Sequence, residues 1–279
     1  MKRWKVTIAL ACAALVGLGC ANLDAKQRAW IFQPSDATWG RTADLARGMA
    51  SVWIDFDSKV TREPGRLHAL WAAQPARANA PVLLYLHGAR WNVESSSPRI
   101  RRLQEMGFAV LAIDYRGFGK SSPLLPSEDS AYEDALAAWQ WLAQKYPQRP
   151  RYIYGHSLGG AVAIDLASHV DDERGTIVEA TFTSIPDLAS SMKWGWLPVG
   201  PLITQRFDSM SKVKKIGSPL LVVHGDSDSL IPSELGRKLY DAATGQKRFV
   251  LVEGGTHHST MGVGFDEYKQ ALAELFSLR

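Results

Sequence analysis

The residues best suited to chemistry begin with a serine between two glycines. Ser157 lies in Gly155-His156-Ser157-Leu158-Gly159, after a short apolar run and before a helix-like run of small residues. A serine in this setting is typical of a sharp strand-to-helix turn that lifts a nucleophilic hydroxyl above the edge of a sheet. The backbone of such a turn is strained, and Gly155 and Gly159 remove Cβ atoms that would clash as strand and helix pass closely. The pattern predicts that Ser157 is a nucleophile.

A serine hydroxyl needs a base to take its proton and a carboxylate to orient that base. An apolar run over residues 220–223 ends in His224-Gly225-Asp226-Ser227-Asp228. We assign Asp228 as the acid, since it precedes a segment where a helix begins with Pro232 near its first turn. Asp226 follows the apolar run immediately, and the alternative is that it caps or braces the turn.

The base is expected after the next apolar run, residues 249–252, which ends in Glu253-Gly254-Gly255-Thr256-His257-His258. We assign His257, which follows the glycine turn directly. His258 is the alternative and is expected to face solvent or the rim of the site. Three other histidines near strand ends are interpreted as loop-packing residues: His87, His156 and His224.

Acyl transfer passes through a tetrahedral oxyanion that needs preorganised N–H donors. One donor is expected to be the backbone N–H of Leu158, directly after the nucleophile. The other is expected from the loop after residues 82–86, and we assign it to Ala89, with Arg90 as the alternative. The sequence lacks paired histidines at metal-ligand spacing, Cys-x-x-Cys and a glycine-rich phosphate loop. The reaction predicted here requires no metal and no organic cofactor.

The elements that must position these residues alternate between apolar strands and helical patterns. Continuous apolar strands alternating with helices indicate a parallel sheet covered on both faces. The sequence therefore predicts an α/β fold with a mostly parallel, twisted sheet of about eight strands. The expected strands cover residues 52–56, 67–73, 82–86, 108–113, 152–154, 176–180, 220–223 and 249–252.

Periodic apolar residues mark three helices. One helix presents Tyr132, Ala135, Leu136, Trp139, Leu142 and Ala143 on one face. A C-terminal helix presents Phe265, Tyr268, Leu272 and Leu275. Ile100 and Leu103 mark a shorter helix, for which Gly107 is the expected C-terminal cap.

Residues from about 181 to 215 break the alternation and are expected to form a small cap over an open site. Trp194 and Trp196 lie in this segment. They are expected to line an acyl pocket, to anchor at a membrane surface, or to pack the cap. Trp91, which follows the second expected oxyanion donor, is a further candidate for lining the pocket.

These motifs together resemble the α/β-hydrolase superfamily, and more closely its small-cap serine hydrolases of the serine aminopeptidase-like type. The resemblance spans residues 82–258 and rests on Leu86-His87-Gly88, Asp114-Tyr115-Arg116-Gly117-Phe118-Gly119-Lys120-Ser121, the segment around Ser157, and those ending in Asp228 and His257. It implies the chain order Ser, Asp, His for the catalytic triad. It also implies that Asp114 braces a loop beside the site.

The resemblance implies a serine hydrolase that cleaves small carboxylic esters through an acyl-enzyme, in the EC 3.1.1 class. One alternative is a serine aminopeptidase-like peptidase, which needs carboxylates for the free amine of its substrate. The cap offers Asp187 and Asp208 for this purpose. A second alternative is a non-catalytic, lipid-anchored scaffold on the same fold.

The N-terminus carries a separate signal. A basic start and an apolar run from Val6 to Gly19 predict a signal peptide over residues 1–19. Leu18-Gly19-Cys20 resembles the lipobox of bacterial lipoproteins, in which the cysteine is lipidated after cleavage. Ordinary cleavage after Ala21 is the alternative. We expect an exported protein of the cell envelope, anchored to a membrane through Cys20, and otherwise periplasmic or secreted.

Composition supports one catalytic domain and argues against a nucleic-acid partner. The 279 residues are 46% hydrophobic and 22% charged, which suits one large core. We expect a lead-in over residues 20–48 and a hydrolase domain over residues 49–279. Removing the signal peptide deletes three basic residues and no acid, so the net charge falls from +4 to +1. That balance gives no case for nucleic-acid binding.

Overall fold

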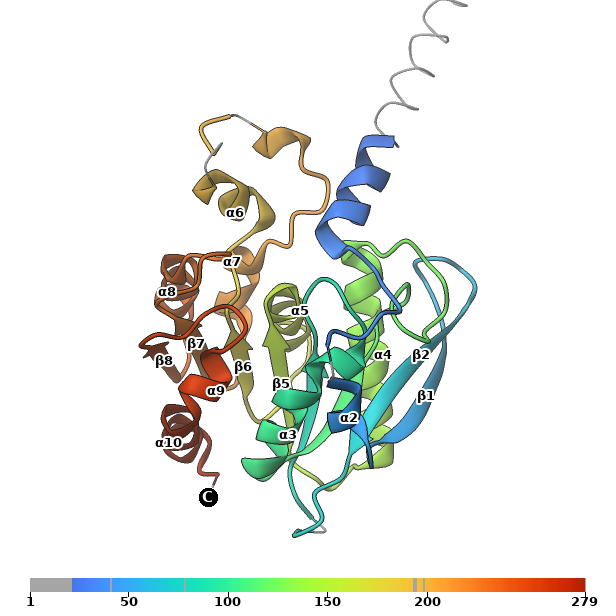
Figure 1. The fold of residues 1–279 in the computed structure, drawn as a ribbon, viewed down its shortest axis with the longest axis vertical. Coiled ribbons are helices and arrows are strands. Elements are labelled where there is room, and N and C mark those ends of the chain that lie inside the picture. Colours follow the sequence, from blue (N-terminus) through green and yellow to red (C-terminus); the bar gives the residue numbers. More distant parts are fainter. Residues whose placement is uncertain (1–21, 41, 78, 193–194, 198, 279) are drawn as a thin grey trace, which may run out of the picture.

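An eight-stranded sheet runs through the middle of the structure, in the order β1-β2-β4-β3-β5-β6-β7-β8 (Figure 1). The computed structural model describes residues 22–278 except 41, 78, 193–194 and 198. The strands are β1 Ala50–Asp57, β2 Pro64–Ala72, β3 Val82–Leu86, β4 Ala109–Ile113, β5 Arg151–His156, β6 Thr176–Glu179, β7 Leu220–Gly225 and β8 Lys247–Val252. Each overlaps one of the eight strands that the sequence predicts.

The sheet is parallel from β4 and β3 through β8, while β2 pairs antiparallel with both β1 and β4. β3, β4 and β7 are buried along their whole length. Continuous apolar strands of this kind require cover on both faces of the sheet. Both the predicted fold class and its mostly parallel sheet are confirmed. The carboxyl ends of β5, β7 and β8 consequently share one edge, where the chemical residues of the sequence also lie.

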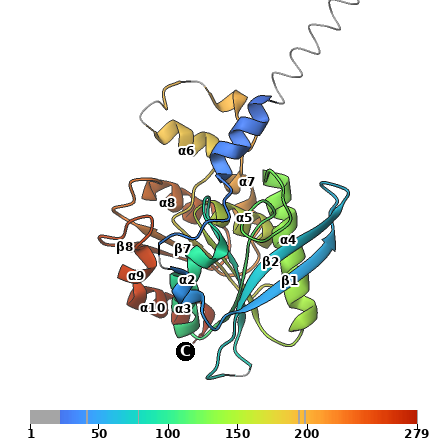
Figure 2. The same cartoon turned by 45° about the vertical axis from the view of Figure 1, so that its right-hand side comes forward.

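Helices cover both faces of the sheet and form two hydrophobic clusters (Figures 1 and 2). On one face pack α4 Glu128–Lys145, α5 Leu158–Ala167 and α8 Ser233–Ala242. On the other pack α3 Ser97–Glu105, α9 Thr260–Val263 and α10 Phe265–Phe276. A short helix, α2 Thr42–Ala46, and a 3-10 turn, η1 Val93–Ser96, precede α3.

The buried face of α4 differs in one position from the expected one. Leu136 is 38% exposed, so its predicted place on the core face was wrong. The helix instead buries Ala131, Ala135, Ala138 and Leu142, which recur at spacings of four, three and four residues. Leu136 is turned by about 100° from its neighbour Ala135, which carries it past the edge of that stripe.

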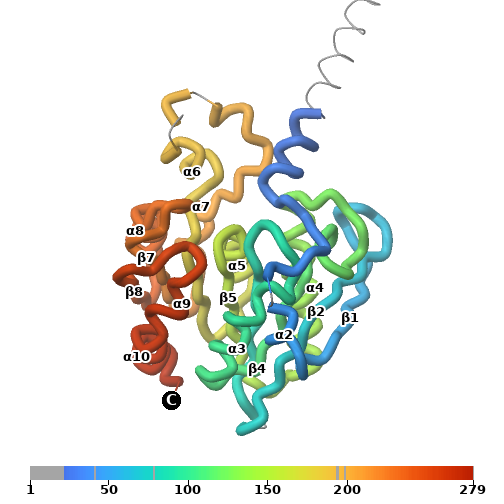
Figure 3. Tube along the Cα trace, in the orientation of Figure 1, coloured from blue at the N-terminus to red at the C-terminus, as the bar shows by residue number. Residues whose placement is uncertain are grey.

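The segment expected to form the cap contains short helices joined by irregular chain. They are α6 Ile185–Ser191, η2 Gly200–Leu202, α7 Ser209–Lys212 and η3 Val213–Lys215. A helix over residues 22–32, which the sequence analysis did not anticipate, lies against this segment (Figure 3). Gln27 donates its side-chain amide to the carbonyl of Leu202 at 2.7 Å, and the hydroxyl of Thr204 donates to Asp24 at 2.7 Å.

The end of that helix docks on the body of the protein, because Phe32 is fully buried in the core. Residues 1–21 lie outside the described residues, and with them the predicted signal peptide and Cys20. Among the helices that the structure describes, none combines the length and the apolar character needed to cross a membrane.

Candidate active site

Ser157 occupies a strained turn between β5 and α5. Its backbone angles are φ 57° and ψ −122°, a region that residues with a Cβ rarely adopt. Two contacts hold the turn. The Ser157 N–H donates to the carbonyl of Glu179 at 2.9 Å, and the Ser157 carbonyl accepts from the Thr181 hydroxyl at 2.8 Å. The next strand, β6, therefore fixes the backbone from which the serine side chain projects.

The glycines around this turn are required by close backbone approaches. A Cβ on Gly155 would lie 2.1 Å from the carbonyl oxygen of Gly159. A Cβ on Gly159 would lie 2.1 Å from the carbonyl oxygen of Leu86. One on Gly160 would lie 2.5 Å from the Cβ of Thr181. The clash of strand against helix that the sequence predicted for Gly155 and Gly159 is confirmed.

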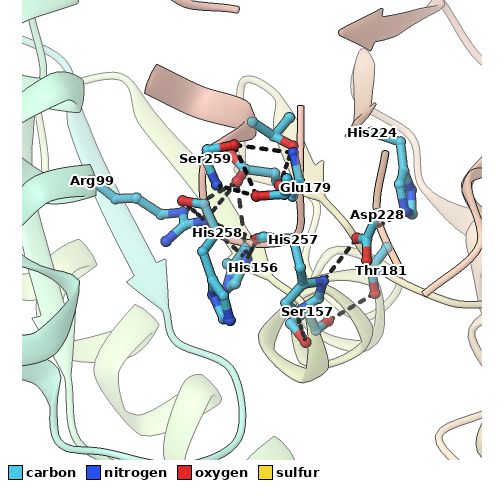
Figure 4. A network of polar contacts seen from close by, with 12 residues as sticks. Arg99, His156, Ser157, Glu179, Thr181, His224, Asp228, His257, His258 and Ser259 are labelled. Atoms are coloured by element: carbon cyan, nitrogen blue, oxygen red, sulfur yellow. Dashed lines mark hydrogen bonds and ion pairs between the residues drawn. The ribbon is translucent and has the colours of Figure 1, made fainter. Parts of the chain in front are cut away.

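Three predicted residues from separate strand ends meet above this turn (Figure 4). The Nε2 atom of His257 lies 3.0 Å from the hydroxyl oxygen of Ser157. The Nδ1 atom of His257 lies 2.8 Å from Oδ2 of Asp228. A neutral imidazole that donates from Nδ1 to the carboxylate keeps an unprotonated Nε2, which can accept the serine proton. The order of contacts is therefore acid, base and nucleophile.

Asp228 is held as a carboxylate. Its Oδ1 accepts hydrogen bonds from the backbone N–H groups of Leu230 and Ile231, each at 2.9 Å. Its Oδ2 faces His257, and His224 Nε2 lies 3.4 Å from the same oxygen. Burial by itself raises the pKa of Asp228, but the hydrogen bonds from His224, His257 and Ile231 outweigh it and hold this pKa well below its usual range.

The alternative acid and base take other places. Asp226 Oδ1 accepts from the Gly254 N–H at 2.8 Å and from the Ser227 hydroxyl at 2.9 Å, so it braces the turn between two strand ends. His258 is exposed, and its ring lies near that of Trp39, with centroids 6.2 Å apart and the ring planes tilted by 33°. Partial burial and the neighbouring His257 lower the pKa of His258. The geometry thus favours Asp228 and His257 over these two neighbours.

The remaining histidines near the strand ends are buried and pack loops, as expected. His87 Nδ1 lies 2.6 Å from the Gly88 carbonyl, and burial lowers the pKa of His87. His224 Nε2 lies 2.9 Å from the Ile231 carbonyl, while its Nδ1 is buried without a partner among the described residues. The proximity of His224 to the acid is a contact that the sequence analysis missed.

Asp114 braces the loop that precedes α3, as the resemblance implied. Its Oδ1 accepts from the Val93 N–H at 2.7 Å, and its Oδ2 lies 3.3 Å from His68 Nδ1. A Cβ on Gly119 would lie 2.1 Å from Oδ2 of Asp114, so this glycine lets the loop close over the carboxylate. Across the described residues, no group of three or more His, Cys, Asp or Glu side chains is placed to hold a metal ion.

Two backbone N–H groups remain as candidate oxyanion donors. Leu158 is the first residue of α5, and the N–H groups of a first helical turn have no partner within the helix. Arg90, the alternative second donor, gives its N–H to the carbonyl of Phe32 at 2.9 Å. Ala89 therefore stays the better candidate. The loop presses against the nucleophile, because a Cβ on Gly88 would lie 3.0 Å from the Cβ of Ser157.

The predicted pocket residues are only partly described. Trp91 is 39% exposed and follows Arg90 in a loop where both residues have positive φ. Trp196 is 73% exposed, so this tryptophan does not serve to pack the cap. Trp194 lies outside the described residues. Among the interactions that the structure describes, Trp91 and Trp196 do not contact Ser157, Asp228 or His257.

Comparison with known proteins points to hydrolases. Residues 77–212 match the serine aminopeptidase family S33. The chain is 34% identical over 216 residues to the lysophosphatidylserine lipase ABHD12 of Danio rerio, which covers 70% of this chain and 56% of the relative. The chain thus spans little more than half the length of that relative. An uncharacterized protein of Mycobacterium tuberculosis H37Rv is 28% identical over 261 residues, covering 92% of this chain and 90% of the relative.

Solved structures share the fold at low sequence identity. The esterase Pf2001 of Pyrococcus furiosus superposes with a TM-score of 0.69 at 22% identity, covering 88% of this chain and 98% of that one. Est1E from Butyrivibrio proteoclasticus, solved with ferulic acid, superposes with a TM-score of 0.66 at 21% identity, covering 81% and 99%. At these identities the likeness establishes the common fold.

Proposed function

We propose that this chain, which has the α/β-hydrolase fold, cleaves carboxylic esters through an acyl-enzyme formed on Ser157. The observation that carries the proposal is the unbroken line of contacts from Asp228 through His257 to Ser157, with spacings of 2.8 and 3.0 Å. The similarity of the chain to a lysophosphatidylserine lipase, and the fold that it shares with the esterase Pf2001, support an ester substrate.

In this proposal the hydroxyl of Ser157 attacks the ester carbonyl carbon while Nε2 of His257 takes its proton. Asp228 accepts the Nδ1–H of His257 and stabilises the imidazolium that forms. The N–H groups of Leu158 and Ala89 donate to the oxyanion. The imidazolium then protonates the departing alcohol. A water molecule, deprotonated by His257, attacks the acyl-enzyme and releases the acid, which restores Ser157.

Two cap carboxylates that a peptidase would use for a substrate amine are already engaged in local structure. Asp187 Oδ2 accepts from the Thr183 hydroxyl at 2.6 Å. Asp208 Oδ1 accepts from the Ser211 N–H at 3.1 Å and caps α7. Both contacts stabilise short helices of the cap. Because Asp187 and Asp208 are engaged in these contacts, the site favours ester hydrolysis over the removal of N-terminal residues from a peptide.

The ester proposal is tested by comparing kcat/KM for p-nitrophenyl butyrate, a lysophospholipid and an aminoacyl p-nitroanilide. We expect hydrolysis of the two esters, little cleavage of the anilide, and loss of ester hydrolysis in Ser157→Ala. Cleavage of the anilide alone would support the peptidase instead. No hydrolysis of any of the three by folded protein would point to the non-catalytic scaffold.

We further propose that the protein resides in the cell envelope, anchored to a lipid bilayer through Cys20. The described part of the helix over residues 22–32 starts two residues after this cysteine, so an anchored chain would hold that helix close to the bilayer. The helix and the cap lie at the same end of the molecule (Figures 1 and 2). Exposed apolar side chains gather on these two segments: Leu23, Trp30, Trp196, Leu197 and Leu202.

Large exposed apolar side chains of this kind suit the interface of a lipid bilayer, where tryptophan is favoured. Flotation with vesicles after expression of the full chain tests the anchor. We expect the wild type to float with the vesicles and Cys20→Ser to float less. A Trp30→Ser, Trp196→Ser double variant is expected to bind the vesicles more weakly than the wild type. Trp53→Ser, on the edge strand β1, is the control and is expected to float like the wild type. Equal flotation of all four proteins would contradict the proposal.

A further inference from the structure

A buried arginine connects the loop of the candidate base to the body of the sheet (Figure 4). Arg99 lies on α3, and its side chain is 15% exposed. Its Nη2 donates to the backbone carbonyls of His257 and His258 at 3.2 and 3.3 Å. The same nitrogen lies 3.1 Å from Nε2 of His156, the residue before the nucleophile. One side chain thus contacts both the base loop and the nucleophile turn.

Glu179 holds this arginine and the nucleophile together. Its Oε1 accepts from Nε and Nη2 of Arg99 at 3.2 and 3.0 Å. Its Oε2 accepts from the hydroxyl of Tyr154 at 2.5 Å and from the hydroxyl of Tyr268. Its backbone carbonyl is the acceptor of the Ser157 N–H. The side chain is fully buried, so its orientation is fixed by the four hydrogen bonds that its carboxylate accepts from these three side chains.

We propose that Arg99 and Glu179 are positioning residues, which together set the distance between the imidazole of His257 and the hydroxyl of Ser157. The inference rests on the proposed function of this triad. The backbone of Glu179 anchors the serine, and its carboxylate anchors Arg99, which in turn anchors the backbone carbonyls of His257 and His258. The positions of the base and of the nucleophile are therefore both fixed by contacts to Glu179, at the end of β6.

Besides this link, the base loop is held by Asp226, which accepts from the Gly254 N–H, and by His156, whose Nε2 lies 3.0 Å from the carbonyl of His257. Two glycines lie just before Thr256 and His257, and Gly254 has a φ of 69°; glycines give this part of the backbone many accessible conformations. Proton transfer requires a separation of about 2.6–3.2 Å between the base and the hydroxyl. Displacement of a reacting group by about 1 Å can lower a rate about 100-fold. Fixing the loop that carries His257 is therefore expected to raise kcat by a large factor.

The positive charge of Arg99 is also balanced by the negative charge of Glu179. Burial lowers the pKa of Arg99, but the Glu179 carboxylate and the surrounding tyrosines raise it above its usual value, so the guanidinium stays charged. Removing only one partner would leave the other charge buried and unpaired, which destabilises the fold. A test of positioning must therefore separate misplacement of the base from unfolding.

The experiment compares Arg99→Met, Arg99→Lys and the double variant Arg99→Met, Glu179→Gln, which removes both charges together. The control is Arg116→Met, because Arg116 is also an interior arginine, 2% exposed, in an ion-pair network with Glu133 and Asp134, but contacts none of the triad. We expect Arg99→Met and the double variant to lower kcat by about 10- to 100-fold with KM changed by less than about threefold. Arg99→Lys, which retains a donor, is expected to recover part of kcat. Arg116→Met is expected to lower the melting temperature and leave kcat of the folded protein unchanged.

Hydrogen exchange of residues 253–260 gives a readout that needs no substrate. We expect faster exchange in the Arg99 variants than in the wild type and in Arg116→Met. If the wild type hydrolyses no ester, the proposed function fails, and the exchange alone decides whether Arg99 holds the loop. A wild-type kcat together with unchanged exchange in the double variant would overturn the positioning role.

Discussion

The substitution Asp228→Asn tests the orientation of the base in a way that the structure makes specific. Asp228 Oδ1 already accepts two backbone N–H groups, from Leu230 and Ile231. An asparagine must keep its carbonyl oxygen there, which turns its NH₂ group toward Nδ1 of His257. That nitrogen must then accept, so the proton moves to Nε2, and His257 loses the lone pair that faces Ser157. The base is present but holds the wrong tautomer.

The expected loss is large because the whole proton transfer is blocked. Reversing the tautomer of a triad histidine lowers kcat by about 10⁴-fold, which corresponds to about 5 kcal/mol of transition-state stabilisation. The packing of the site is expected to survive, since the substituted side chain has the same shape. KM for p-nitrophenyl butyrate should therefore stay within about threefold of the wild-type value.

Asp226→Asn is the matched control, because Asp226 is two residues away and accepts from the Gly254 N–H through an oxygen that asparagine retains. Its kcat is expected to remain within about threefold of the wild type. Steady-state kinetics of both variants at pH 8, with melting curves to confirm folding, decide the matter. The reasoning is refuted if Asp228→Asn keeps more than about a tenth of wild-type kcat, or if Asp226→Asn loses as much as Asp228→Asn.

Three further outcomes follow from the same geometry. Gly159→Ala places a Cβ 2.1 Å from a carbonyl of β3 and is expected to lower the free energy of unfolding by about 3 kcal/mol or more, whereas Gly262→Ala, with open space around it in α9, should change it by less than about 1 kcal/mol in urea denaturation. Burial and Arg99 hold the pKa of His156 well below its usual range, so His156 binds a proton at a higher pH in the unfolded chain than in the folded one. The free energy of unfolding should therefore fall as the pH drops below about 6.5, by up to about 1.4 kcal/mol per pH unit. His156→Gln should make this decline between pH 7.5 and 5.5 shallower. His257→Ala should lower kcat by about 10⁴-fold and His258→Ala by less than about fivefold in the same ester assay, and a reversed order would mean that the base is His258.

The sequence was most informative where chemistry restricts the backbone. The glycines beside Ser157 are needed because the backbone approaches so closely there that a Cβ on Gly155 or Gly159 would clash with a carbonyl oxygen. This requirement can be recognised in the sequence, because it fixes which residue types stand around the serine. The apolar runs predicted the six parallel strands β3 to β8, because a parallel sheet covered on both faces needs continuous apolar strands. Such local rules also favoured Asp228 over Asp226, and the structure places these two residues in different contacts.

What the sequence did not reveal depends on contacts between distant segments. Arg99 and Glu179 are 80 residues apart, and no local pattern connects them. A charged residue at the end of the apolar strand Thr176–Glu179 was the one available signal, because a buried carboxylate requires partners. The helix over residues 22–32 was missed because its fixed position arises from bonds to the cap, such as that from Gln27 to Leu202.

The most direct test of the account is labelling of a purified protein spanning residues 21–279 with a fluorophosphonate, followed by mass spectrometry of the modified peptide. The account predicts a single phosphonate adduct on Ser157 that is absent in Ser157→Ala and slowed by orders of magnitude in His257→Ala. Folded wild-type protein that takes up no label, or that carries the label on another residue, would contradict the claim that Ser157 is a nucleophile activated by His257 and Asp228.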